Sequence, residues 1–266
     1  MHAQTFLSSN HAMKRVKTAD KYILLPVEEE EGYAHIRVIK DNQVVKEFNC
    51  KLAINKTDYN VPLDVSEYGG EVLLDIQFSG DKRSIGLINN FVCWKDIKAT
   101  NVFDSKNREK FRSIYHHTPV YGWMNDPNGF VYFRGEYHLF YQFYPYDSVW
   151  GPMHWGHAKS KDLLHWEELP VALAPSESYD KDGCFSGSAI VKDDKLYLLY
   201  TGHVDDEEKR EETQCLAVST DGITFEKLPT NPVIHAQHIE GIADIADFRD
   251  PKVFEYQGSY YAVVAS

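Results

Sequence analysis

The sequence predicts an all-β protein in which a small N-terminal β-sandwich precedes the first two and a half blades of a β-propeller. In residues 21–105, short runs of alternating apolar residues are separated by polar turns, which is typical of a sandwich. From residue 110 onward, strand–turn–strand segments recur at intervals of about 60 residues. Helical periodicity does not separate these segments, so the repeats favour propeller blades over alternating strands and helices.

The N-terminal part divides into a tail and a strand-rich module. Residues 1–20 show no clear strand pattern and are predicted to form an N-terminal tail. Residues 21–105 are predicted to form the sandwich module, and no grouping of potential catalytic side chains is evident in its sequence. The predicted strands of this module are KYILLPV, AHIRVIKD, QVVKEFNCKL and EVLLDIQF.

Residues 110–266 repeat a unit of two hairpins. The segments GFVYFRGEYHLFYQ, SAIVKDDKLYLLYTG and PKVFEYQGSYYAVVA each contain a strand, a polar turn and a strand, with turns near Arg134, Asp193 and Gln257. A second pair of segments, SKDLLHW and STDGITF, has the same offset of about 60 residues. Two hairpins make a four-stranded unit, and tandem four-stranded units are propeller blades. The third unit has only its first hairpin before Ser266.

Each unit opens with a polar motif. Asp126 lies in WMNDPNG, Ser186 in CFSGS and Asp250 in FRDPK, at equivalent positions before the three hairpin turns. First strands of propeller blades line the central axis, so these side chains are expected to converge. Proline follows both aspartates, which favours an extended, stiff backbone at each. Asp-Pro-Asn-Gly alone is most often an ordinary turn, but two Asp-Pro pairs in equivalent positions favour a shared site.

Composition and spacing disfavour several classes of function. The chain has 40 acidic and 28 basic residues and a net charge of −12, which disfavours a nucleic-acid partner. No apolar window is long enough to predict a membrane-spanning segment. His154 and His157 are three residues apart in a predicted strand, so their imidazoles should diverge rather than bind a metal. No metal or other cofactor is predicted. The four dispersed cysteines predict buried thiols: Cys50, Cys93, Cys184 and Cys215.

The convergent carboxylates favour glycoside chemistry. An aromatic, polar funnel without metal ligands or a phosphate-binding loop suits glycosyl transfer better than acyl or phosphoryl transfer. One carboxylate can form a covalent glycosyl intermediate while a protonated carboxyl group donates to the leaving oxygen. Spacing alone does not assign the two roles.

Six ordered motifs from about Tyr115 onward resemble glycoside hydrolase family 32, which contains invertases, inulinases and levanases. These motifs are WMNDPNG, YQFYPY, WGPMHWGHA, DGCFSGSA, YTGH and FRDPKVF. The resemblance implies a five-bladed propeller followed by a β-sandwich. It also implies release of fructose from β-fructofuranosides, with retention, through a fructosyl-enzyme intermediate.

The N-terminal half is similar to a β-module that precedes the hydrolase domain in some bacterial levanases, which favours levan or inulin over sucrose as substrate. The resemblance also implies export to the periplasm or the cell exterior. The first residues lack the apolar core of a signal peptide, so a cytoplasmic location is the alternative.

The same resemblance assigns roles to individual residues. Asp126 would be the nucleophile, Asp250 the stabiliser of the transition state, and Arg249 the residue that fixes charge and hydrogen bonding in the site. Propeller packing is the alternative role for Trp150, and a turn hydroxyl is the alternative for Ser186. The remaining substrate-binding positions implied are Asn125, Gln142, Trp150, Phe185 and Ser186.

One departure from the family pattern shapes the functional prediction. The family's general acid/base is the Glu of a Glu-Cys motif, and this sequence contains no Glu-Cys. We therefore expect an N-terminal fragment of a longer hydrolase, inactive by itself. The glutamates of EEEEG, HWEEL and DDEEKREE are predicted to be solvated, so Asp126 and Asp250 should face each other across an open groove with no glutamate beside them. A propeller that binds carbohydrate without catalysis, and a purely structural propeller, are the alternatives.

Overall fold

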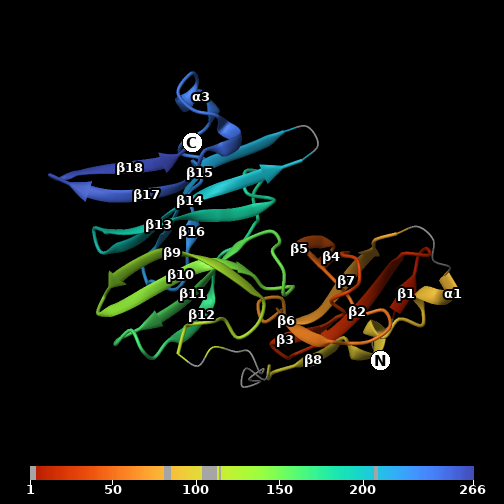
Figure 1. Ribbon diagram of the computed structural model, residues 1–266. Coiled ribbons are helices and arrows are strands. Elements are labelled where there is room, and N and C mark those ends of the chain that lie inside the picture. The colour runs from red at the N-terminus through yellow and green to blue at the C-terminus, as the bar shows by residue number, and fades with distance from the viewer. Residues whose placement is uncertain (1–3, 81–84, 104–112, 114, 207–208) are drawn as a thin grey trace. The chain divides into compact units, whose positions relative to one another are not determined.

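The structure, a computed structural model, describes residues 4–80, 85–103, 113, 115–206 and 209–266. The chain forms two compact, strand-rich units, and each is described by itself (Figure 1). The predicted boundary at residues 105–110 lies outside the described residues. The first unit comprises residues 1–110, 120–122 and 145–149, and the second comprises residues 111–119, 123–144 and 150–266.

The first unit contains two antiparallel sheets, as the predicted sandwich requires. The order of the five-stranded sheet is β1-β2-β7-β4-β5 and that of the three-stranded sheet is β6-β3-β8. The four predicted runs form β3, β4, β5 and β7. The elements are β1 (Gln4–Phe6), β2 (His11–Thr18), β3 (Tyr22–Val27), β4 (Ala34–Lys40), β5 (Gln43–Cys50), β6 (Tyr59–Asp64), β7 (Gly70–Phe78), α1 (Ile85–Ile88), α2 (Cys93–Asp96) and β8 (Lys98–Thr100).

The expectation that residues 1–20 form a tail is wrong. β2 pairs with β7 along its whole length, so this segment belongs to the five-stranded sheet. Its inward positions are Ala12, Lys14 and Val16, all buried. The Lys14 ammonium donates a hydrogen bond to the Trp94 carbonyl at 2.7 Å, which satisfies a charge that would otherwise be costly to bury. Because the charged residue Lys14 lies between Ala12 and Val16 on the inward face, the sequence of β2 lacks the regular alternation of apolar and polar residues that predicts a strand.

The second unit consists of two four-stranded sheets and a two-stranded sheet, which confirms the predicted two and a half propeller blades. The sheet orders are β12-β11-β10-β9, β13-β14-β15-β16 and β17-β18. The first blade has β9 (Trp123–Phe133), β10 (Glu136–Tyr144), β11 (His154–Ser160) and β12 (Glu167–Leu173); the second has β13 (Gly183–Lys192), β14 (Lys195–Asp205), β15 (Arg210–Ser219) and β16 (Glu226–Lys227); then follow α3 (Ala236–Ile239), the 3-10 turn η1 (Ile245–Asp247), β17 (Arg249–Tyr256) and β18 (Ser259–Ala265).

The first hairpin of each blade closes at the predicted turn. The central residues are Arg134-Gly135, Asp193-Asp194 and Gln257-Gly258, and all six have positive φ. Two central residues with positive φ define the type I′ turn, whose twist matches that of the flanking strands. The repeat in the sequence therefore corresponds to the same turn geometry in the first hairpin of each blade.

The second repeated segment is also confirmed at the level of hydrogen bonds. Asp162 and Asp221 each accept from the backbone N–H groups two and three residues further along the chain. Ser160 and Ser219 each donate a side-chain hydrogen bond to the aspartate of their own turn. The backbone hydrogen bonds lower the pKa of Asp221 to about 2. The two turns are therefore equivalent ends of the third strands.

The first strands of successive blades lie side by side, as predicted. β9 contacts β13, and β13 contacts β17. The buried Ser188 hydroxyl of β13 donates to the Pro251 carbonyl at 2.7 Å and accepts from the Val253 N–H at 2.8 Å, which joins the second blade to the third sheet. The motifs that begin these strands are thereby brought to one region.

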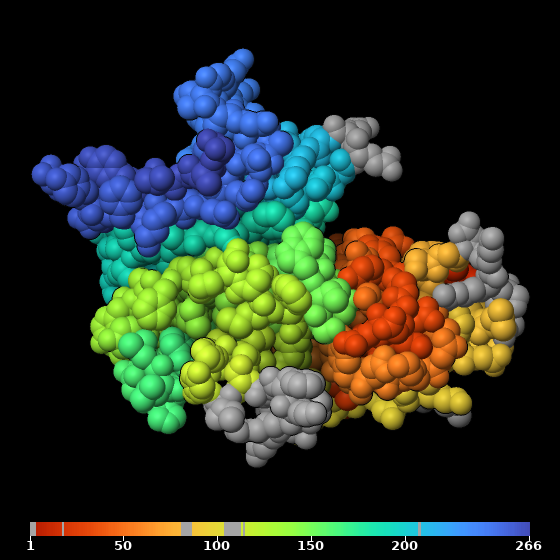
Figure 2. All heavy atoms as spheres, viewed as in Figure 1, coloured from red at the N-terminus to blue at the C-terminus, as the bar shows by residue number. Residues whose placement is uncertain are grey.

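The β17–β18 hairpin forms an exposed margin of the second unit (Figure 2). Apolar and aromatic side chains cover this margin. The exposed apolar and aromatic side chains of this hairpin are Phe254, Tyr256, Tyr260, Tyr261 and Val263.

Substitution of Gly187 by alanine is expected to lower the free energy of unfolding by about 1–3 kcal/mol, the usual cost of overpacking. A Cβ atom there would lie 2.1 Å from the Leu199 carbonyl oxygen and 2.8 Å from the Tyr200 Cα, so backbone would have to move. Urea unfolding monitored by circular dichroism measures the change. Asp193→Asn is the control, because Asp193 is an exposed turn residue whose φ of +49° suits asparagine. Equal unfolding midpoints for the two variants would contradict the prediction.

Candidate active site

Irregular pairing in the first strand of each blade places the predicted catalytic side chains. In the first blade, Met124 pairs with Phe143 and Pro127 pairs with Tyr141. Two residues of β9, Asn125 and Asp126, therefore oppose the single residue Gln142 of β10. This two-against-one arrangement is a β-bulge.

The second and third sheets have the same irregularity at the equivalent motif. Phe185 pairs with Thr201 and Gly187 with Tyr200, so Ser186 is the extra residue of β13. In the third sheet the register shifts between Arg249 and Lys252, and Asp250 lies in that interval. A bulge bends its strand and redirects a side chain, and bulges are frequent beside active sites. Three bulges in register thus aim three polar side chains at one region.

The two Asp-Pro frames differ in their backbone conformation. Asp250 has φ of +60°, in the left-handed region, whereas Asp126 is not among the described residues with positive φ. The expectation of one extended frame for both is therefore wrong at Asp250. Its N–H donates to the Thr201 hydroxyl at 3.1 Å, and that hydroxyl donates to the Gln214 side chain, also at 3.1 Å. These buried contacts offset the cost of the unusual backbone.

The negative charge of Asp126 acts on the carboxyl group of Asp250. The Ser186 hydroxyl donates to Asp126 Oδ2 at 3.0 Å. The pKa of Asp250 is raised, first because partial burial removes hydration from its carboxylate, and further because the negative charges of Asp126 and Glu212 lie nearby. The positive charge of Arg249 opposes this shift. The structure therefore brings the three predicted motifs together, as the propeller geometry requires.

Arg249 is held by acidic partners on three sides. Its Nη1 donates to Glu212 Oε2 at 2.9 Å and to the Asp247 carboxylate. Its Nε lies 3.9 Å from Asp250 Oδ2. The hydrogen bonds to Asp247 and Glu212 raise the pKa of Arg249, which keeps a fixed positive charge beside Asp250.

Glu212 corrects two expectations. The segment DDEEKREE was predicted to be solvated, yet the Glu212 side chain is 0% exposed. No glutamate was expected beside the two aspartates, yet the charge of Glu212 acts on Asp250. Residues 212–215 are all buried, so no alternation in the sequence singles out Glu212. A run of charged residues predicted exposure there instead.

Aromatic side chains flank the carboxylates. The Phe185 ring stacks on the His203 imidazole, with centroids 3.8 Å apart and an angle of 13° between the planes. Trp150 meets Phe185 edge to face at 6.0 Å and is 52% exposed. The Trp155 indole donates to the Phe185 carbonyl at 3.0 Å, which fixes the strand that carries Phe185. Trp150 and Phe185 thus form an accessible aromatic surface suited to a sugar ring.

The two predicted amide side chains are engaged within the protein. Asn125 Oδ1 accepts from the Trp123 indole at 2.8 Å, and Asn125 is half-buried. Gln142 is buried, and its Nε2 donates to the Cys184 carbonyl at 3.0 Å, which connects the first blade to the second. Gln142 therefore stabilises the bulge that it opposes.

The two histidines of MHWGHA have different hydrogen-bond partners. His154 Nδ1 is bonded to the Pro152 carbonyl at 2.9 Å, whereas His157 Nε2 is bonded to His138 Nδ1 at 2.9 Å. Burial lowers the pKa of His157 to about 3, so it is neutral at physiological pH. The predicted divergence of the imidazoles is confirmed. The four cysteines are buried free thiols, also as predicted.

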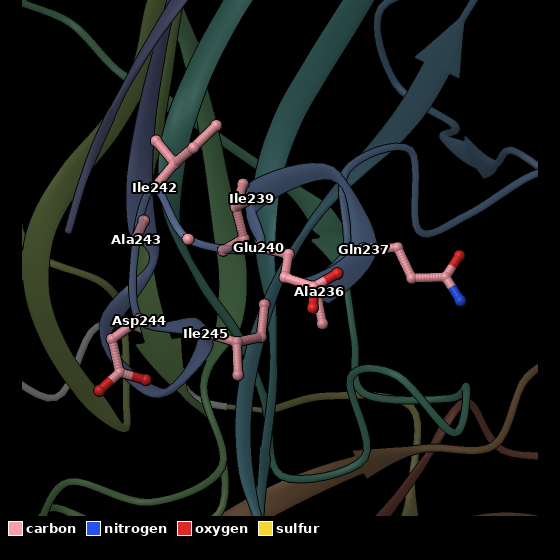
Figure 3. Close-up of a pocket in the computed structure, with 9 residues that line it drawn as sticks. Ala236, Gln237, Ile239, Glu240, Ile242, Ala243, Asp244 and Ile245 are labelled. Atoms are coloured by element: carbon pink, nitrogen blue, oxygen red, sulfur yellow. The ribbon is translucent and has the colours of Figure 1, made fainter.

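A separate hollow lies between α3 and η1 and contains none of the predicted site residues (Figure 3). One continuous segment lines it, residues 236–245 except His238, and the lining is mainly apolar. Its carboxylate Asp244 accepts from the Ala246 N–H and so caps η1. We assign the candidate site to the bulge region because the interacting carboxylates and the arginine lie there.

Comparison with known proteins divides the chain at about residue 115. The model for the glycosyl hydrolases family 32 N-terminal domain matches residues 116–266, and the model for a domain of unknown function, DUF4980, matches residues 8–115. A sucrose-6-phosphate hydrolase of Zymomonas mobilis is 52% identical over 161 residues, which cover 56% of this chain and 29% of that protein. The levanase of Bacillus subtilis is 48% identical over 161 residues, covering 56% and 22%.

Among solved structures, a mutant GH32 β-fructofuranosidase of Bombyx mori in complex with sucrose matches with a TM-score of 0.52 and 51% identity. The match covers 57% of this chain and 32% of that chain. The chain thus spans about a third or less of the length of these relatives. Across the described part of the chain, no helix is both long and apolar enough to cross a membrane.

Proposed function

The chain belongs to glycosyl hydrolase family 32, and from this premise we propose that the protein hydrolyses β-fructofuranosidic bonds in sucrose- or fructan-type carbohydrates. One observation carries the proposal: three in-register bulges gather Asp126, Ser186 and Asp250, with Arg249 beside them. The names of the relatives, sucrose-6-phosphate hydrolase and levanase, support the substrate class.

Asp126 is the nucleophile in this proposal. Its side chain is exposed, and the Ser186 hydroxyl bonded to Oδ2 orients the carboxylate and leaves Oδ1 free to approach a sugar. A carboxylate oxygen attacks the anomeric carbon, the glycosidic C–O bond breaks, and a proton from a general acid neutralises the leaving oxygen. Water then cleaves the fructosyl ester, and two inversions give net retention.

Asp250 and Arg249 stabilise the transition state in the same proposal. Asp250 has a 51% exposed side chain and a backbone fixed by Thr201, so its carboxylate can accept hydrogen bonds from fructosyl hydroxyls without rearrangement. Arg249 supplies a fixed positive charge at 3.9 Å from that carboxylate. Hydrogen bonds that strengthen as positive charge develops on the sugar accelerate the reaction.

Glu212 does not fit the role of general acid. It is fully buried, and its Oε2 accepts a hydrogen bond from Arg249, so it has no access to a leaving group. The proposal therefore takes the general acid from outside the described residues.

Binding without catalysis is the competing function. It accounts for the aromatic surface of Trp150 and Phe185, but it gives no reason for a serine-oriented Asp126 beside an arginine-supported Asp250. The arrangement of charges favours hydrolysis.

An assay of the complete protein on sucrose, inulin and levan tests the proposal. We expect fructose release that saturates with at least one of these substrates, measured by chromatography of the products. Binding of a fructoside by calorimetry without fructose release would support the non-catalytic propeller. Absence of both binding and release would contradict the proposed function and its substrate class.

A further inference from the structure

The fully buried carboxylate of Glu212 contacts Arg249, which lies next to Asp250, and His203, which stacks on Phe185. Glu212 is on β15, the third strand of the second blade, and its side chain is 0% exposed. Its Oε2 accepts from Arg249, while its Oε1 faces His203 and Arg210, each at 3.3 Å. Burial of a carboxylate costs desolvation free energy, and an apolar side chain would fill the same space without that cost. Packing alone therefore does not explain a glutamate at this position.

We propose that Glu212 is a positioning residue of the site, which fixes the Arg249 guanidinium beside Asp250 and packs against His203, whose ring stacks on Phe185. This inference rests on the function proposed above for its effect on turnover. Its geometric part concerns only the contacts among these side chains and is testable without a substrate.

Glu212 acts on Asp250 through Arg249. Nη1 of Arg249 is committed to Glu212 and Asp247, which leaves Nε at 3.9 Å from Asp250. Because the guanidinium is anchored from behind, it remains near Asp250 without forming a short ion pair with it. Asp250 therefore keeps its oxygens available for a ligand. Without Glu212, the guanidinium would be free to close on Asp250 and compete with that ligand.

Glu212 also lies beside His203, which contacts the aromatic surface of Phe185 and Trp150. His203 is buried, and burial lowers its pKa, so the imidazole is neutral beside Glu212 at physiological pH. His203 Nδ1 lies 3.3 Å from Glu212 Oε1 without a hydrogen bond between them, so Glu212 packs against the ring that stacks on Phe185. Phe185 in turn meets Trp150 edge to face. Glu212 thus adjoins the surface expected to bind the sugar ring.

Charged and titratable groups from several elements face this cluster, so the effect of removing Glu212 has a definite sign. Glu212 and Asp126 raise the pKa of Asp250 by like-charge repulsion, and Arg249 lowers it. Loss of the Glu212 charge, and a closer approach of Arg249, both lower the pKa of Asp250. The groups around the cluster are Asp126 on β9, His203 and Asp205 on β14, Arg210 on β15, Asp247 in η1, Arg249 and Asp250 on β17, and Asp182 before β13.

Three variants of the complete protein separate the effect of the Glu212 charge from the effect of its side-chain length. Glu212→Gln removes the charge and keeps the shape, whereas Glu212→Asp keeps the charge and shortens the side chain by one methylene. Glu211→Gln is the matched control, because Glu211 is the adjacent residue, 37% exposed, and pairs with Lys209 at 2.9 Å. The readouts are the titration of the Asp250 carboxyl by 13C NMR without substrate, assigned with Asp250→Asn, and the pH dependence of kcat/KM on sucrose.

In Glu212→Gln we expect the Asp250 titration and the acid limb of kcat/KM to move to lower pH, with kcat/KM reduced about 10- to 100-fold, as for other groups that orient active-site residues. Glu212→Asp keeps the charge but loosens Arg249, so its Asp250 titration should move in the same direction and less than in Glu212→Gln, with kcat/KM still reduced, and Glu211→Gln should change neither. An unchanged Asp250 titration in a folded Glu212→Gln protein would overturn the inference. If that variant does not fold, wild-type kcat/KM in Glu212→Asp would overturn it. A wild-type protein without fructosidase activity would refute the proposed function, and the titration would still decide the role of Glu212.

Discussion

Replacement of Asp126 by alanine is expected to lower kcat for fructoside hydrolysis by roughly four to six orders of magnitude, as expected for loss of a covalent nucleophile. The side chain is exposed on the β9 bulge and contacts Ser186, so its removal leaves no buried group without a partner. The unfolding midpoint should therefore remain close to that of the wild-type protein. Initial rates on sucrose and circular dichroism measure the two quantities.

A turn aspartate provides the control for this substitution. Asp193 is exposed in the β13–β14 hairpin, and its φ of +49° suits asparagine, so Asp193→Asn should keep full activity and stability. Wild-type turnover in Asp126→Ala, with the control also active, would show that Asp126 does not act as the nucleophile.

The hairpins of the second unit could be predicted because their turns impose local chemistry. Positive φ at Arg134-Gly135 and Gln257-Gly258 requires residues that tolerate it, and polar residues or glycine occupy those positions in the sequence. The turns at Asp162 and Asp221 likewise repeat a Ser-x-Asp pattern whose hydrogen bonds are local. Features that depend on a few neighbouring residues leave a signal in the sequence.

The bulges could not be predicted in the same way. A bulge is a register shift between two strands, so the extra residue Ser186 is defined by the pairs Phe185–Thr201 and Gly187–Tyr200 on either side of it. The sequence indicated that the three motifs would converge, since they begin equivalent strands. It did not indicate that Asp250 would adopt a left-handed backbone, which depends on buried contacts to Thr201.

Two of the charged residues that were misassigned share one physical cause, and Glu28 of EEEEG is a third that is buried, with its carboxylate accepting from the Ile54 and Asn55 N–H groups. Lys14 and Glu212 occupy inward positions of strands, and each is satisfied by a partner distant in sequence, the Trp94 carbonyl and Arg249 respectively. A charged residue in a strand pattern predicts exposure unless its partner is known. Buried charges are therefore the positions at which a reading of one sequence fails, and Glu212 shows that such a position can belong to the site.

Substitution of Asp250 by asparagine is expected to lower kcat about 10²- to 10³-fold and to change KM modestly, because its hydrogen bonds to the sugar strengthen in the transition state. Asparagine keeps the size of the side chain and tolerates the φ of +60°, so the fold should persist.

The pH dependence and a trapping experiment separate Asp250 from Asp126. Because the pKa of Asp250 is raised, the wild-type acid limb should reflect protonation of Asp250 as pH falls, and Asp250→Asn should lose that contribution. Activity of the wild type is thus present above this pKa and lost below it, whereas the variant should lose less of its residual activity at acid pH. An activated fructosyl fluoride should trap its adduct on Asp126, located by mass spectrometry of peptides. An adduct on Asp250 would exchange the two roles, since the residue that forms the ester is the nucleophile.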